Sequence, residues 1–449
     1  MPRLHDDDRR DAAAERPSPQ PASASPASRV LALQSTAGNA AVGRMLARYG
    51  TGEHAQMGGA RTTKIQGVEL EEGEIVALGD FYETAAEMMS ADPAELSQLV
   101  VLIRRDRDAK LGKPGANHVS TAEWQAATSK RKGKNYLALA EDNASHFAPA
   151  KAGAAAGGRN HKAEWEKYHQ QALEKALAAA GGDGKVPPEA IALNGFAAHF
   201  LTDAFAAGHL FNKQEMLERA KAEWKKLATT GYVFEENKLT KAVAKQVLAD
   251  PVAGRKLKAK ELKLIDWGPV NEQRFSEFLW QMADSDKSRD KFFNAFLLMV
   301  HNRLNASVRD EPGFAIHVEN ARGDAWDLSG DDTLANSPRT LEIALQAVDE
   351  SYANLKLAAR TTGVLDHAAC FKRVWDYTPK PTKIGAEHME ALIKSALDYD
   401  DTDVQDAFAQ ITIDNVGVAI AELEKKGYLR DIPAEVPKED RRLPLGSKI

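Results

Sequence analysis

The chain has 449 residues, of which 43% are hydrophobic and 28% are charged, and its formal net charge is −6 at pH 7. This composition predicts a soluble globular protein with a large core and room for more than one domain, and the acidic balance gives it no overall attraction to nucleic acid. The single cysteine, Cys370, excludes an intrachain disulfide, and neither a transmembrane run of about 18 apolar residues nor a signal peptide is evident, so we expect a cytoplasmic protein.

The first 28 residues are rich in proline, serine, alanine and charge, which predicts a disordered leader. Apolar residues then recur at helical spacing over residues 29–46, on both sides of a break at Gly38 and Asn39. This segment resembles the LQ..AGN.AV.R.L segment near the N-termini of actinobacterial proteins associated with extracellular contractile injection systems. The resemblance implies that residues 1–50 are a delivery signal that binds injection-system components and takes the protein out of its producer. The alternative is a short amphipathic helix that docks on the body.

The rest of the chain predicts an all-α fold with one small β-hairpin. Helical periodicity recurs over residues 80–90, 93–106, 162–180, 188–207, 213–228, 238–249, 271–300 and 338–358. Apolar and polar residues alternate over residues 314–326 around an Asn/Gly turn, which predicts the hairpin. A composition shift near residue 361 separates a body of residues 51–360 from a small helical C-terminal region of residues 361–449, whose tail from residue 433 is expected to fray.

The segment from Phe196 to His209 is the most informative, because it spaces His199, Asp203 and His209 as His-x3-Asp-x5-His within an apolar run. In a helix, His199 and Asp203 lie on one face, about 6 Å apart along the axis, and can share an ion. His209 lies about 9 Å further along, so either the helix breaks at Gly208 or His209 serves a second metal. A buried helix with satisfied core histidines is the alternative, but an unpartnered buried carboxylate costs several kcal/mol, which favours a metal.

This spacing resembles the central motif of the zinc-dependent phospholipase C superfamily, which includes single-strand-specific zinc nucleases. The sequence Ser-His146-Phe147 resembles the SHF ligand segment of that family, and residues 165–173 are placed like the long helix before its metal helix. The resemblance covers roughly residues 50 to 310. It implies that His146, His199 and Asp203 bind the inner metals, that His209 begins another site, and that one to three Zn²⁺ ions are held.

The chain departs from the family downstream of the motif. The next family ligands follow closely as His-x3-Glu or His-x3-Asp, whereas no histidine occurs here between His209 and His301. The nearest substitute is His301 with Asn305, and asparagine is a weaker, neutral oxygen ligand.

The family also has a base-like or metal-bridging aspartate before its SHF histidine, for which Asp142 and Asp80 are the candidates. Its N-terminal ligand would correspond to His54. Without a metal, Asp80 would cap a helix that starts at Phe81, and His54 would be a solvated loop residue. Of the other histidines, we expect His161 in a glycine-rich linker and His169 on a helix surface.

Zinc with an open coordination position lowers the pKa of bound water to about 7. The resemblance therefore implies phosphodiester hydrolysis, with a phospholipid as the substrate and with Asp142 or Asp80 positioning or deprotonating the water. A zinc nuclease on the same scaffold is the alternative enzyme, and the basic run at residues 129–134 would contact phosphate or form a solvated loop. A non-catalytic adaptor stabilised by a metal is the alternative of another class.

Overall fold

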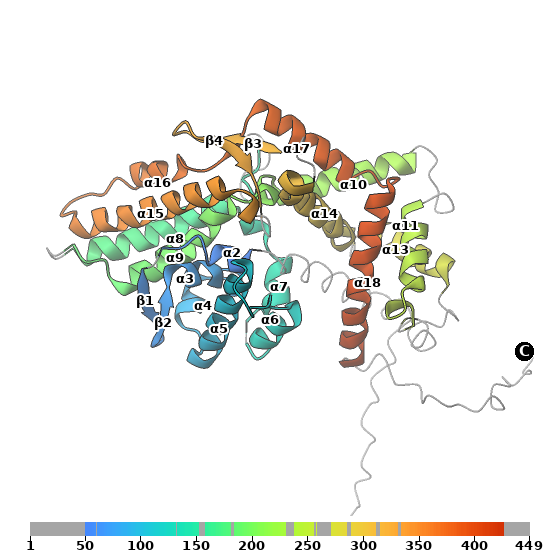
Figure 1. Cartoon of the computed structure of the whole chain (residues 1–449), viewed down its shortest axis with the longest axis horizontal. Helices are drawn as coiled ribbons and strands as arrows, with labels where there is room; N and C mark the ends of the chain where they lie inside the picture. The colour runs from blue at the N-terminus through green and yellow to red at the C-terminus, as the bar shows by residue number, and fades with distance from the viewer. Residues whose placement is uncertain are drawn as a thin grey trace, which may run out of the picture.

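Figure 1 shows the computed structural model of the chain. The structure describes residues 50–425 apart from residues 60, 132, 152–157, 181–183, 230–237, 256, 258–270, 285–288, 311–314 and 331–333. The predicted disorder of the leader, its helix and the fraying of the tail from residue 433 concern residues outside these ranges.

The fold is all-α, as the sequence predicted, and the described residues form two small antiparallel sheets where the sequence predicted one hairpin. The helices of the described residues are α2 (Thr51–His54), α3 (Glu72–Leu78), α4 (Ala85–Met89), α5 (Pro93–Lys110), α6 (Thr121–Thr128), α7 (Tyr136–Glu141), α8 (His161–Ala178), α9 (Pro188–Asp203), α10 (Lys213–Thr229), α11 (Lys238–Ala249), α13 (Glu272–Asp284), α14 (Arg289–Asp310), α15 (Pro338–Arg360), α16 (His367–Trp375), α17 (Lys383–Ala396) and α18 (Thr402–Lys425). The 3-10 turns are η1 (Ala144–His146), η2 (Ala207–His209) and η5 (Leu334–Asn336). The strands are β1 (Thr62–Ile65), β2 (Val68–Glu71), β3 (Ile316–Glu319), β4 (Ala325–Leu328) and β5 (Lys380–Pro381).

Most predicted helices are confirmed, including α5, α8, α10, α11 and α15. The helix predicted over residues 80–90 was wrong at its start. Residues 80–84 precede a short α4 instead of forming its first turn, because Thr84 accepts the amide of Glu87 and so starts the helix there. Within the predicted stretch 271–300 the described residues form α13 and the start of α14, and residues 285–288 between them lie outside the described ranges.

The predicted hairpin is confirmed as β3 and β4, with Val318 opposite Trp326. The β1–β2 hairpin was not predicted. Its two-residue turn has φ values of 50° at Gln66 and 81° at Gly67, the left-handed pair that a tight hairpin needs. Gln-Gly is a weaker turn signal than Asn-Gly, and the strands are only four residues long.

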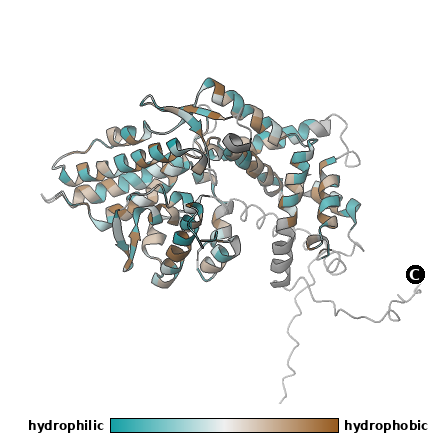
Figure 2. Cartoon of the chain, in the orientation of Figure 1, coloured by the Kyte–Doolittle hydropathy of each residue, from teal (hydrophilic) through white to brown (hydrophobic). Residues whose placement is uncertain are grey.

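Helix α9 is the centre of the body, where α8, α15 and α3 pack against it (Figure 1). Every residue of α9 from Leu193 to Asp203 is buried, so this part of the helix has no solvent face. Figure 2 shows hydrophilic and hydrophobic residues interleaved along α8 and α15, the pattern of helices that bury one face. Because amphipathic helices surround α9, the side chains of its buried residues lie inside the protein.

The C-terminal elements continue this core. Strand β5 pairs with β3, α17 packs on α14 and β3, and α18 packs on α11 and α14. Cys370, Leu392 and Phe408 belong to the same hydrophobic cluster as the residues of α9. The domain boundary near residue 361 stays a prediction. Among the described helices, none combines the length and apolar character needed to cross a bilayer.

Candidate metal centre

Helix α9 delivers His199 and Asp203 into the interior of the body. It begins at Pro188, and proline suits the first helical position because the amide lost there has no partner in any helix. His199 and Asp203 are 0% and 1% exposed. Gly79, at the end of α3, lies against the His199 ring so closely that a Cβ there would be 2.2 Å from Cγ of the imidazole. The missing side chain at Gly79 therefore makes room for His199.

His209 returns to Asp203 because the helix ends. Helix α9 stops at Asp203, earlier than the predicted break at Gly208, and the turn η2 follows. In this arrangement His209 Nδ1 lies 3.2 Å from Asp203 Oδ1. The amide of Gly208 donates to Asn305 Oδ1 on α14, which fastens η2 in place.

The Asp203 carboxylate lies at the centre of four imidazoles. Its Oδ2 is 3.0 Å from His146 Nδ1 and 3.7 Å from His199 Nε2. Its Oδ1 is 3.5 Å from His54 Nε2 and 3.2 Å from His209 Nδ1. Burial opposes ionisation, but the imidazoles of His146, His199 and His209 outweigh it and hold the pKa of Asp203 well below its usual value. The site therefore presents an ionised, buried carboxylate to a ring of nitrogen donors.

Both carboxylate oxygens of Asp203 are buried, and neither accepts a well-aligned hydrogen bond from another described residue. Buried polar atoms in native proteins almost always have a partner, and exceptions often mark an ion that belongs there. The arrangement fits a cation, because a positive ion would satisfy the carboxylate and the lone pairs of the imidazoles together.

His54 is oriented by a hydroxyl on α9. Thr202 Oγ1 lies 2.9 Å from the carbonyl of His199 and donates its proton there. It therefore accepts the bond from His54 Nδ1, at 2.7 Å. This fixes the proton on Nδ1 and leaves Nε2, which faces Asp203, as a lone-pair donor, the arrangement that metal-binding histidines require. The alternative of a solvated loop residue is wrong for His54, which lies in α2 and is 4% exposed.

Asp80 approaches the cluster from the turn after α3. Thr51 donates to its Oδ2 at 2.6 Å, and its Oδ1 lies 4.0 Å from His199 Nε2. Burial raises the pKa of this carboxyl above its ordinary value. Asp80 does not cap a helix, since the N-cap of α4 is Thr84.

Two groups of side chains can each hold a metal ion. They are His54, Asp80 and His199, and His146, His199 and Asp203, with the donor atoms of each group within 4.8 Å of one another. His199 belongs to both groups. Because a single ring nitrogen binds a single ion, the groups are overlapping parts of one centre in which Asp203 faces both sides.

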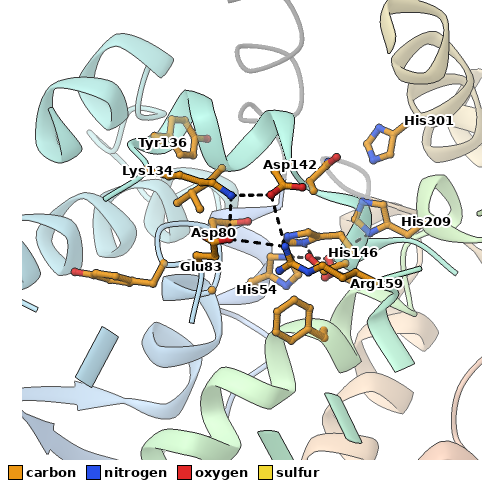
Figure 3. Close-up of a pocket in the computed structure, with 17 residues that line it drawn as sticks. His54, Asp80, Glu83, Lys134, Tyr136, Asp142, His146, Arg159, His209 and His301 are labelled. Carbon is orange, nitrogen blue, oxygen red and sulfur yellow. Dashed lines mark hydrogen bonds and ion pairs between the residues drawn. The ribbon is translucent and has the colours of Figure 1, made fainter. Parts of the chain in front are cut away.

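Asp142 lies at the opening of the pocket, away from the imidazoles. It ends α7, is exposed, and accepts from Lys134 Nζ at 2.7 Å. Its partial burial raises the pKa of its carboxyl, but the positive charges of Lys134, Arg159 and Lys213 outweigh that effect, so the pKa lies below its usual value. Figure 3 shows Asp142 paired with Lys134. Asp80 and His54 line the same pocket but are less exposed, with side chains at 18% and 5% against 50% for Asp142. A catalytic role for Asp142 stays a prediction.

His301 reaches the same pocket from α14, with its ring centroid 5.0 Å from that of His209. Its Nδ1 is 3.0 Å from Asn302 Oδ1, and the amide nitrogen of Asn305 is 3.3 Å from its Nε2. Asn305 Oδ1 already accepts the amide of Gly208. Asn305 therefore acts as a clamp between α14 and η2, and metal binding by His301 stays a prediction.

Two histidines lie deeper than expected. His161 opens α8 and is buried, which lowers its pKa to about 3. His169 is also buried in α8, where it stacks on Trp165 and its Nδ1 is 2.7 Å from Asn194 Oδ1. The predictions of a linker and of a surface face were wrong. For His169, the signal was its i,i+4 spacing from Trp165, which places both on the apolar face of α8.

Sequence reasoning missed Thr51, Thr202 and Arg159, which orient or surround the centre, and it named Lys134 only as part of the basic run at residues 129–134. Only Thr202, beside Asp203, was marked by its position in the sequence. Comparisons with models of protein families, with curated proteins and with solved structures give no match to this chain. The resemblance to the zinc-dependent phospholipase C superfamily thus rests on the motif residues, and what the structure defines is an all-α protein with a buried histidine–aspartate centre.

Proposed function

We propose that the chain is a zinc-dependent phosphodiesterase of the phospholipase C kind. The observation that carries this proposal is the Asp203 carboxylate, which faces imidazole nitrogens of His146 and His199 at 3.0 and 3.7 Å at the base of an accessible pocket. Imidazole and carboxylate donors suit zinc, and a pocket beside them leaves room for substrate. When bound, zinc lowers the pKa of a water to about 7 and neutralises charge that develops on a phosphoryl group.

The residues of the chain have separate tasks in this proposal. His146, His199, Asp203 and His54 hold the metal. Asp80 is the second carboxylate of the cluster, and because Thr51 occupies its Oδ2, its Oδ1 remains toward the imidazoles to orient a water and accept its proton.

A small phosphodiester head group fits the pocket better than a nucleic acid does. Its aromatic lining residues Tyr82, Tyr136 and Phe200 are 4%, 2% and 3% exposed, and buried rings cannot stack on bases. The net charge of −6 also disfavours a polyanion. A phospholipid head group is therefore the substrate proposed here.

Delivery by a contractile injection system is the second part of the proposal. It rests on the resemblance of residues 29–46 alone. Deleting residues 1–50 should abolish co-purification with injection particles and leave zinc content unchanged, whereas retained loading would overturn this part.

The test of the enzyme is zinc content by elemental analysis together with hydrolysis of bis(p-nitrophenyl) phosphate and of phosphatidylcholine vesicles. Asp203→Asn should lose zinc and activity. Asp327→Asn is the matched control, because Asp327 pairs with His317 on the surface of the β3–β4 hairpin, away from the pocket. A folded wild-type protein that takes up no zinc would overturn the proposal.

A second variant distinguishes the enzyme from the non-catalytic adaptor. His199→Ala in a protein that remains folded should remove hydrolysis. Zinc that stabilises a wild-type protein without any phosphodiesterase activity would favour the adaptor instead.

A further inference from the structure

The pocket opening carries four charged side chains of alternating sign, which we call the charged mouth: Glu83, Lys134, Asp142 and Arg159. They come from the turn after α3, the segment before α7, the end of α7 and the segment before α8. All four line the pocket and are between 33% and 50% exposed. Figure 3 shows the four side chains near the imidazoles, joined to one another by hydrogen bonds and ion pairs.

The two cations of the charged mouth are held unequally. Lys134 Nζ hydrogen-bonds to Glu83 Oε1 at 2.9 Å and to Asp142 Oδ2 at 2.7 Å. Arg159 Nη1 is 3.6 Å from the same oxygen of Asp142 and 4.0 Å from the same oxygen of Glu83. These two contacts exceed hydrogen-bond length. The hydrogen bond of Arg159 is made by Nε, to Glu164 at 3.2 Å.

This inequality leaves Arg159 able to change partners. Glu164 holds Nε, so the guanidinium stays at the opening with Nη1 toward the pocket. If Nη1 turns to an incoming anion, Glu83 and Asp142 both keep their hydrogen bonds to Lys134, so neither carboxylate is left without a cation. Guanidinium binds carboxylate and phosphate oxygens in a forked geometry that an ammonium cannot reproduce.

We propose that Arg159 selects phosphodiesters whose head group carries an anionic oxygen group, a carboxylate or a second phosphate, over head groups that are only cationic. This inference rests on the proposed function, because it requires the reacting phosphate to lie at the metal centre and its head group to point to the charged mouth. A serine head group fits best, since its carboxylate meets Arg159 while its ammonium meets the carboxylate of Asp142, which Arg159 Nη1 then no longer faces.

The test compares two ligands that differ by one carboxylate, phosphoserine and phosphoethanolamine. Their dissociation constants for the zinc-loaded full chain are measured by calorimetry. Wild type should bind phosphoserine about tenfold more tightly. Arg159→Ala should remove that preference, and Arg159→Lys should restore only part of it. Lys162→Ala is the control, because Lys162 lies in the first turn of α8, close to Arg159 in sequence but outside the pocket lining, and it should keep the full preference.

Three results would overturn the inference. The first is equal binding of the two ligands by wild type, and the second is a preference that survives Arg159→Ala in a folded protein. The third is Arg159-dependent binding of oligothymidylate that is tighter than that of phosphoserine, which would indicate a nucleic acid substrate. Hydrolysis of bis(p-nitrophenyl) phosphate, which has no head group, is measured in parallel. If the wild type does not hydrolyse this compound, the proposed function is refuted. If it does hydrolyse it but shows no head-group preference, only the role of Arg159 is refuted.

Discussion

Replacing Gly79 by alanine should damage the metal centre through steric overlap alone. The backbone of Gly79 has φ −58° and ψ −27°, which alanine adopts without strain. The added Cβ, however, would lie 2.2, 2.5 and 2.6 Å from Cγ, Cδ2 and Cβ of His199. Carbon atoms in contact are normally about 3.5 to 4.0 Å apart, so the ring must move by an ångström or more. Such overpacking costs typically about 1–3 kcal/mol.

The displaced ring belongs to both metal-binding groups, so Gly79→Ala should also lower zinc content. The assay is urea unfolding of the zinc-free and zinc-loaded proteins, with elemental analysis of the second. We expect the free energy of unfolding to fall by about 1–3 kcal/mol without zinc. With zinc it should fall further, because the variant is stabilised less by binding the ion.

Two glycines supply matched controls. At Gly195 on α9 an added Cβ would meet the side chain of Ile75 on α3 at 2.7 Å, so Gly195→Ala should destabilise the same α3–α9 interface and leave zinc binding intact. At Gly363 no heavy atom lies within 4 Å, so Gly363→Ala should be neutral or stabilise by about 0.4–1 kcal/mol. Unchanged stability and zinc content in Gly79→Ala would refute the placement of His199 against this turn.

Three further predictions concern residues around the centre. Thr202→Val removes the acceptor that orients His54 and should weaken zinc affinity about 10–100-fold in chelator competition. Asn305→Ala leaves the buried amide of Gly208 without its acceptor and should lower unfolding free energy by about 1–3 kcal/mol in urea. For His169, burial lowers the folded-state pKa from 6.5 to about 4, so the unfolded state takes up the proton first. Stability is therefore retained above about pH 6.5 and lost by roughly 3 kcal/mol as the pH falls to about 4, and His169→Gln should flatten that dependence in unfolding experiments from pH 7 to 4.

Each of these has an outcome that contradicts it. Wild-type zinc affinity in Thr202→Val would mean that the hydroxyl does not set the tautomer of His54. Unchanged stability in Asn305→Ala would mean that α14 does not hold η2. A His169→Gln variant with the same acid sensitivity as wild type would assign that sensitivity to other groups.

The pairing of His199 with Asp203 was predictable from sequence because a helix is a local structure. Residues four apart in a helix lie on the same face whatever surrounds it, so the motif predicted their approach. The all-α class followed from the same 3.6-residue periodicity. The end of α9 was misplaced at Gly208, because a run of small apolar residues contains no local stop signal and the contacts that fix η2 come from Asn305 and Ser329.

The remainder of the centre was decided by the tertiary structure. His54, Asp80 and His146 come from separate elements. The spacing of residues within a motif does not predict which candidates far apart in the sequence will contact one another. Asp80 and Asp142 were equal candidates in sequence, whereas packing leaves Asp80 half-buried beside His199 and Asp142 exposed with Lys134. The burial of His169 depends likewise on α15, which brings Ser351 onto it. Sequence thus determined which residues share a helix face, and the packing of those faces decided which residues form the site.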